Sequence, residues 1–175
     1  SEKEEVKKRL KDNMRRAEEL IRRDDREVEE NRKRHDELVK EWDKRLREIL
    51  KKAEDSGLPE EVKKELKEIV DRIREEMKRL NEEYKRLVEE HKKRNEKVLR
   101  DYRDLLRRIE ELIERNDLSE KEIKEVLEEL SRTSKRLIED SKRSSERLSE
   151  RSKRTNEEIE RIVRAAKRTI EERER

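Results

Sequence analysis

Residues 55–59 read Asp-Ser-Gly-Leu-Pro, and this short stretch decides how the chain folds. Gly57 suits a left-handed residue directly after a helix end, and Leu58 can fold back onto the last helical turn. Pro59 fits the first turn of a following helix, where its missing N–H removes no hydrogen bond. The stretch therefore predicts that one long helix ends here and that a second helix begins.

A second break, residues 116–119 (NDLS), divides the remainder of the chain. Asn116 can adopt the left-handed conformation that ends a helix. Ser119 and Glu122 have the spacing of a capping box at the start of the next helix. The two breaks predict three helices of nearly equal length, over roughly residues 2–54, 59–115 and 120–174.

The composition favours long helices over other structures. Of 175 residues, 60% are charged and 27% apolar, and 54 Lys and Arg nearly cancel 51 Asp and Glu. One Gly, one Pro and an abundance of Glu, Lys, Arg and Leu are typical of continuous helix. The absence of Cys excludes disulfides and thiolate metal sites. No apolar run approaches the roughly 18 residues of a membrane span, so we expect a soluble protein.

Apolar residues recur every 18 residues within the predicted helices. Two such series in the second helix are Val62, Leu80 and Val98, and Ile69, Leu87 and Leu105. A repeat of 18 residues in five turns equals about 3.6 residues per turn, whereas a heptad repeat gives about 3.5 and a left-handed supercoil. The sequence predicts an all-α, nearly straight, antiparallel three-helix bundle with up-down-up order and a single domain over residues 1–175.

Folding the chain at its two breaks sets polar core positions opposite one another. Facing residues of the first two helices have numbers that add to 115, as those of Asp24 and His91 do. Between the second and third helices the numbers add to about 235, which sets His91 opposite Ser144. Apolar positions likewise meet, as in an expected layer of Leu10, Leu105 and Leu130. The core is therefore predicted to alternate apolar and polar layers.

Many predicted core positions carry amides, hydroxyls, imidazoles or a carboxylate. They are Asn13, Asp24, Asn31, His35, Tyr84, His91, Asn95, Tyr102, Ser134, Ser141, Ser144, Ser145, Ser152, Thr155 and Asn156. An unpaired buried polar group costs about 1–3 kcal/mol, so these groups must pair for the chain to fold. Paired groups are roughly neutral in stability but fix register, because a slip of one turn sets Asn and Ser against Leu. A polar cavity for a small ligand is the functional alternative.

Patterns for catalysis, metal and nucleic acid are weaker. Asp24 and His91 offer half of a metal site, but the Glu-x-x-His pairs of di-iron bundles are absent. Asp24, His91 and Ser144 match a catalytic triad in residue type, but a continuous helical core has no oxyanion hole. Residues 132–154 are basic and Ser-rich, like an arginine/serine RNA-binding segment, yet the net charge is only +3. We expect no enzyme activity, metal, cofactor, nucleic acid or membrane partner.

The whole chain resembles computationally designed, de novo helical bundles with buried hydrogen-bond networks. The resemblance rests on matched helix lengths, two short loops, surfaces of Glu, Lys and Arg, and layered polar residues. It implies a structural scaffold without natural substrate or compartment, cytoplasmic on recombinant expression. The single apolar stripe of each helix predicts a monomer. The alternative is an interaction module in which the Ser-rich residues 141–156 bind a partner helix or ligand, with self-association as its sign.

Overall fold

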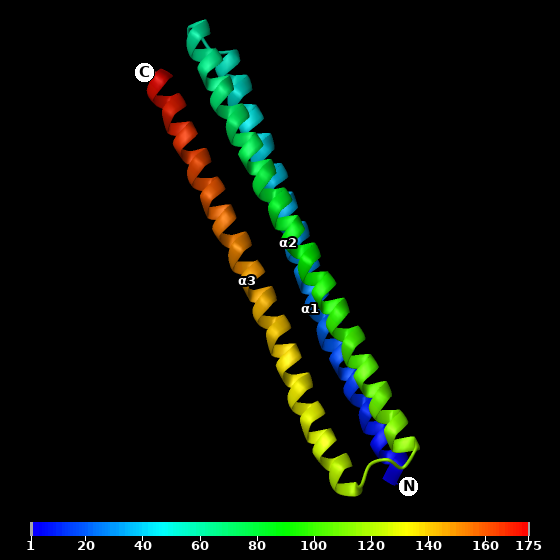
Figure 1. Ribbon diagram of the computed structural model, residues 1–175. Helices are drawn as coiled ribbons and strands as arrows, with labels where there is room; N and C mark the ends of the chain where they lie inside the picture. The colour runs from blue at the N-terminus through cyan, green and yellow to red at the C-terminus, as the bar shows by residue number, and fades with distance from the viewer. Residues whose placement is uncertain (1, 175) are drawn as a thin grey trace. The chain divides into compact units, whose positions relative to one another are not determined.

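The computed structural model consists of three α-helices, α1 (Glu2–Glu54), α2 (Glu60–Glu114) and α3 (Glu120–Glu174) (Figure 1). The structure describes the backbone of residues 2–174 and the side chains of residues 2–169, 171 and 172. The predicted all-α class and three-helix bundle are confirmed. Among the described residues, no helix combines the length and apolar character needed to cross a membrane.

The helix bounds agree with the predicted ones except at the two ends of α2. Pro59 lies just outside the helix, because its carbonyl accepts the first hydrogen bond, from the Lys63 N–H at 3.1 Å. It is therefore the N-cap residue, and the helix begins at Glu60 instead of residue 59. At the other end α2 stops at Glu114, one residue before the predicted end.

The first loop ends α1 differently from the prediction, since Gly57 does not adopt a left-handed conformation. Ser56 performs the capping instead. Its hydroxyl donates to the Ala53 carbonyl at 2.5 Å and accepts the Leu58 N–H at 3.4 Å. Leu58 does fold back, packing against the cluster of Ala53 and Leu66. A side-chain hydroxyl thus caps the end of α1, where the sequence predicted a left-handed glycine.

The second loop follows its prediction closely. Asn116 has a φ of 56°. Its N–H donates to the Ile113 carbonyl and the Asp117 N–H to the Leu112 carbonyl, both at 3.1 Å, which is a Schellman motif. The Ser119 hydroxyl accepts the Glu122 N–H, and the Glu122 carboxylate accepts the Ser119 N–H, each at 3.2 Å. These two hydrogen bonds form the predicted capping box.

The chain divides into two compact units, each with segments from all three helices. Unit 1 comprises Ser1–Val28 and Glu89–Arg147, and unit 2 comprises Glu29–Val88 and Leu148–Arg175. The single domain expected over residues 1–175 stays a prediction. Each unit is described below by itself.

Unit 1 encloses an apolar cluster whose buried members are Leu10, Ala17, Tyr102, Leu106, Ile109, Ile113 and Leu130. Ion pairs of Lys7 with Glu114 and of Arg103 with Glu18 flank this cluster. In both pairs the residue number rises along α1 as it falls along α2, so the two helices are antiparallel within the unit.

Unit 2 also has an apolar cluster, whose buried members are Val39, Leu46, Val70, Ile73, Met77, Ile159, Val163 and Ala166. Arg74 donates to Asp43 at 2.6 Å across α1 and α2, and Arg151 donates to Glu83 at 2.6 Å across α2 and α3. The helices of this unit therefore surround an ordinary aliphatic core with an ion-paired rim.

The apolar stripe of α2 corrects one predicted layer. Leu105, expected in the core with Leu10 and Leu130, is 38% exposed, whereas its neighbour Leu106 is only 6% exposed. The same displacement by one residue puts Val70 and Val88 in the core. The 18-residue period was thus correct, but the more buried member of each apolar doublet is the second. One residue turns the helix by about 100°, and the sequence could not decide which side chain points inward.

We predict that Gly57→Ala is neutral or stabilises the protein by about 0.4–1 kcal/mol. Gly57 lies outside the left-handed region, and a Cβ built on it meets nothing within 4 Å, so Ala removes only unfolded-chain freedom. Asn116→Ala is expected to destabilise by about 1–2 kcal/mol because of its positive φ. Urea denaturation of both variants measures this difference. Equal losses at the two sites would contradict the loop geometry.

A matched pair in α2 tests the phase of its apolar stripe. Leu106→Ala should cost about 2–5 kcal/mol, because it opens a cavity beside the cluster of unit 1. Leu105→Ala should cost less than half as much, since that side chain is already partly in solvent. The free energies of unfolding of the two variants decide the matter, and the reverse order would restore the layer predicted from the sequence.

Candidate functional site

A polar network inside unit 1 is the candidate site, and each of the three helices supplies two of its residues. They are Asp24 and Asp25 from α1, His91 and Asn95 from α2, and Ser141 and Ser144 from α3. Residues three or four apart share a helix face, so the α2 pair and the α3 pair each point to one place. Asp24 and Asp25 are adjacent in α1 and diverge by about 100°, which brings two carboxylates to the site from different directions.

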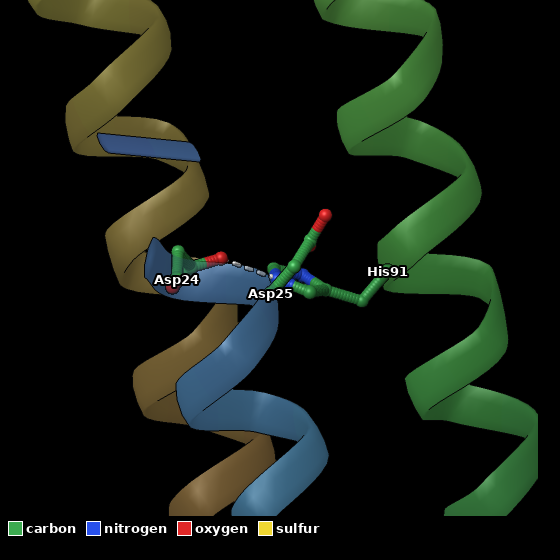
Figure 2. A group of neighbouring side chains, drawn as sticks. All are labelled: Asp24, Asp25 and His91. Atoms are coloured by element: carbon green, nitrogen blue, oxygen red, sulfur yellow. Dashed lines mark hydrogen bonds and ion pairs between the residues drawn. The ribbon is translucent and has the colours of Figure 1, made fainter. Parts of the chain in front are cut away.

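His91 is the centre of the network and is only 1% exposed. Its Nε2 lies 2.8 Å from Asp24 Oδ2, the contact drawn in Figure 2. Its Nδ1 lies 2.8 Å from Ser144 Oγ. An ionised carboxylate only accepts, so Nε2 carries the proton. Ser144 Oγ also accepts from Arg94 at 3.5 Å. Both ring nitrogens of His91 are therefore paired.

Asn95 is 4% exposed and joins the three helices. Its amide nitrogen donates to Asp24 Oδ2 at 3.2 Å and to Asp25 Oδ1 at 2.7 Å. Its amide oxygen accepts from Ser141 Oγ at 3.0 Å. Both donor hydrogens and the acceptor are therefore used, so the orientation of this amide is determined by its partners.

Asp24 is held as a carboxylate by its neighbours. Its Oδ2 accepts from His91 and from Asn95, and it shares with the Asn95 oxygen the one proton of the Ser141 hydroxyl, which lies 3.0 Å away. Burial alone would raise the pKa of Asp24, but hydrogen-bonding groups of His91, Ser145 and Asn95 outweigh it and leave the pKa lowered. The site therefore contains a fixed negative charge.

Asp25 differs from its neighbour in its electrostatics. Desolvation and the adjacent Asp24 charge raise its pKa, while the hydrogen bond from Asn95 and the charge of Lys92 oppose that rise. Two carboxylates with one amide between them thus have pKa values displaced in opposite directions.

Unit 2 contains a second group of polar side chains around His35, which is 2% exposed. His35 Nδ1 lies 3.3 Å from Ser152 Oγ, and its ring lies against that of Tyr84 with centroids 4.6 Å apart. Burial lowers the pKa of His35, whereas the neighbouring Asn156 amide and Asp36 carboxylate oppose that change. The group includes an aromatic contact that the network of unit 1 lacks.

Several buried atoms among the described residues have no partner within hydrogen-bond geometry. They are His35 Nε2, Asn81 Oδ1, Tyr84 Oη and Asn156 Oδ1 in unit 2, and Tyr102 Oη in unit 1. Burial raises the pKa of both tyrosines, and the neighbouring Ser152 and Ser134 hydroxyls offset part of that rise. The two polar groups are therefore unequal, because pairing is more complete around His91 than around His35.

The remaining predicted polar residues are Asn13, Asn31, Ser134, Ser145 and Thr155. Asn13 and Ser134 are half-buried and line a groove between α1 and α3 of unit 1. Asn31 is half-buried, and Thr155 is 6% exposed. Ser145 donates to the Lys142 carbonyl of its own helix at 2.9 Å. Residue numbers that place two positions opposite each other therefore did not determine which hydroxyls form hydrogen bonds across helices.

Sequence reasoning missed three polar residues that the structure brings into these groups: Asp25, Asp36 and Asn81. Asn81 is 7% exposed and donates to Asp36 at 3.1 Å. It lies four residues after Met77 and three before Tyr84, a spacing that assigns it to the same core stripe. Asp25 gave no comparable signal, because it follows a core position directly and resembles any surface acid.

The Asp24–His91–Ser144 chain matches a hydrolytic triad in contacts but not in surroundings. A nucleophilic serine needs donors for the oxyanion beside it. Ser144 lies in the middle of α3, where backbone N–H groups are committed to the helix. The chain offers hydrogen bonding and charge, without the reacting geometry of acyl transfer.

Comparison of the chain with known protein families, with characterised proteins and with solved structures finds no match. The function of this chain is therefore inferred from its own fold and polar network.

We predict that His35 makes the protein less stable as the pH falls from 7.5 towards 5. Its folded pKa lies below the ordinary 6.5, so the unfolded chain takes up this proton first. Stability is then lost as the pH falls through about 6.5 and until the folded pKa is reached. Urea denaturation of the parent and of His35→Gln across this range isolates the effect. Identical slopes for the two proteins would contradict it.

Proposed function

We propose that the protein is a computationally designed structural scaffold whose buried polar network sets the register of its helices. Its proposed state is a monomer without a natural substrate. One observation carries the proposal: Asp24, His91, Asn95, Ser141 and Ser144 pair with one another across three helices inside unit 1.

The energetics of a register shift support this function. Moving α3 by four residues would bring Leu148 to the place of Ser144. His91 Nδ1 would then be buried without a partner, at about 1–3 kcal/mol, while Ser145 would replace Ser141 beside Asp24. A purely aliphatic core would resist the same shift far less, since one leucine would replace another.

A designed origin is supported by regularity at several levels. The three helices have 53, 55 and 55 residues. Both loops use compact capping devices, and the sequence is 60% charged with one Gly and one Pro. Agreement among capping, patterning and core pairing is typical of idealised bundles. The absence of any match among known proteins is compatible with this origin.

The alternative, an interaction module that uses the Ser-rich residues 141–156, has less support. Ser141 is 9% exposed and its hydroxyl contacts Asp24 and Asn95, and Ser144 contacts His91. These hydroxyls are used inside unit 1 and are not presented to a partner. Size-exclusion chromatography with light scattering separates the two, because self-association would favour the module.

Replacing Asp24, His91 and Ser144 together by Leu tests the scaffold function. We expect the free energy of unfolding to stay the same or to rise, because apolar residues of similar size often replace buried polar networks without loss. Register should become less specific. The chain has no native Cys, so spin labels on cysteines at the exposed Arg22 in α1 and Lys124 in α3 report it.

The parent should give one narrow distance between the labels. The triple variant should add a second distance or a broad distribution, since a slip of one turn moves a helix by about 5.4 Å. Ser131→Ala with Ser149→Ala, two exposed serines, is the control and should keep the narrow distance. A triple variant that unfolds, or that retains one narrow distance, refutes the register function.

A further inference from the structure

We propose that Asp24, Asp25, His91 and Asn95 bind one divalent transition-metal ion of borderline hardness, such as Zn²⁺ or Co²⁺. One potential ligand atom from each of Asp24, Asp25 and His91 lies within 4.8 Å of the other two. Figure 2 shows the Asp24 carboxylate joined to the His91 imidazole by a dashed line, with the Asp25 side chain drawn across the same ring in this view. The inference depends on this geometry and is independent of the scaffold function.

Coordination requires the three ligand atoms to approach one another. Zn²⁺ lies about 2.0–2.2 Å from nitrogen and oxygen ligands, so tetrahedral ligand atoms are roughly 3.4 Å apart. The three atoms here lie within 4.8 Å of one another. Asp25 is half-buried, and rotation of its side chain brings its carboxylate closer to the other two ligands.

A positively polarised group already lies where the three ligand atoms converge. Asn95 Nδ2 is 3.2 Å from Asp24 Oδ2, 2.7 Å from Asp25 Oδ1 and 3.4 Å from His91 Nε2. The last contact joins two donors in the neutral tautomer, so packing and not hydrogen bonding places the amide there. A cation near this position, with the Asn95 amide drawn back to make room for it, would meet the same three atoms with a stronger attraction.

The network can reorganise around a metal ion while Asn95 and Asp24 keep their contacts with Ser141. Turning the Asn95 amide by half a rotation presents its oxygen to the metal and its nitrogen to Ser141 Oγ. The Ser141 hydroxyl accepts that N–H and still donates to Asp24, since it lies 3.0 Å from both residues. The serine changes from donor to acceptor towards Asn95, a change that only a hydroxyl allows.

His91 reorganises in the same way. Metal coordination requires a free lone pair on Nε2, so the ring proton moves to Nδ1 and the imidazole neither gains nor loses a proton. Ser144 Oγ, 2.8 Å from Nδ1, then accepts that proton instead of donating its own. A hydrogen bond of this kind fixes the orientation of metal-bound histidine in proteins.

The donor set selects the class of ion. One imidazole nitrogen, two carboxylates and one amide oxygen suit Zn²⁺ and Co²⁺, whereas Ca²⁺ and Mg²⁺ prefer oxygen ligands alone. The two carboxylates together balance the charge of a divalent cation. Among the described residues, no other group of three His or acidic side chains meets the same distance condition.

Titration of the full chain with Co²⁺ after treatment with a chelator tests the site. We expect saturation at one ion per chain with the intense visible absorption of low-coordinate Co²⁺, and displacement by Zn²⁺. Nitrogen chemical shifts of the His91 ring should show the proton moving from Nε2 to Nδ1. That shift is specific to coordination, because a cation on surface carboxylates would leave the ring unchanged.

Two ligand variants and two controls locate the ion. Asp25→Asn and His91→Gln should each weaken Co²⁺ binding at least about tenfold, the smallest loss usual for groups around a metal. Asp25→Asn is the more informative, since its half-exposed side chain is less important for folding. His35→Gln and Asp36→Asn, the matched pair in unit 2, should bind Co²⁺ as the parent does.

The proposal is overturned if Co²⁺ does not saturate the parent at millimolar concentration. It is also overturned if Asp25→Asn leaves the affinity unchanged, or if the controls lose binding to the same extent. These outcomes leave the register measurement untouched, so failure of the metal site and failure of the scaffold function are distinguishable.

Discussion

The buried carboxylate of Asp24 is the constraint on which the structure of unit 1 depends. A half-buried ion with a missing partner destabilises a core by several kcal/mol, so its donors cannot be arbitrary. Nε2 of His91, the amide of Asn95 and the hydroxyl of Ser141 all reach one oxygen of it. Each donor comes from a helix other than α1, and satisfying one ion therefore aligns three helices at one height within the unit.

The two polar groups show how much depends on completeness of pairing. Around His91 both ring nitrogens have partners, whereas around His35 one nitrogen, a tyrosine hydroxyl and two amide oxygens lack them. Unit 2 has, besides the aliphatic cluster that includes Leu46 and Ile159 at 0% and 1% exposure, a second buried cluster of Ala53 and Leu66. Apolar burial stabilises the fold without selecting one register of the helices. Paired polar groups select a register but add little net stability. The two units therefore rely on different balances of the same forces.

Much of the fold could be predicted from the sequence because helix ends and periods are local properties. The capping box at Ser119 and the turn at Asn116 required only nearby residues. The facing of Asp24, His91 and Ser144 followed from the loop positions and a constant rise per residue. Gly57 and Leu105 were assigned wrongly, since a serine hydroxyl replaced the expected turn and one residue of phase separates Leu105 from Leu106. Asp25 was missed because it directly follows a core position and its surroundings in the sequence are those of any surface acid.

The same residue types explain why a structural network and a metal site can share one place. Serine, asparagine and neutral histidine each contain both a donor and an acceptor, so a network built from them has more than one complete pairing. A lysine or arginine in place of Asn95 would satisfy Asp24 and Asp25 equally well, but it could only donate and would exclude a cation. The choice of an amide at a position where two carboxylates and an imidazole converge thus leaves the site neutral enough to stay buried and basic enough to bind a metal. The same lone pairs can therefore either accept hydrogen bonds within the network or coordinate a metal ion.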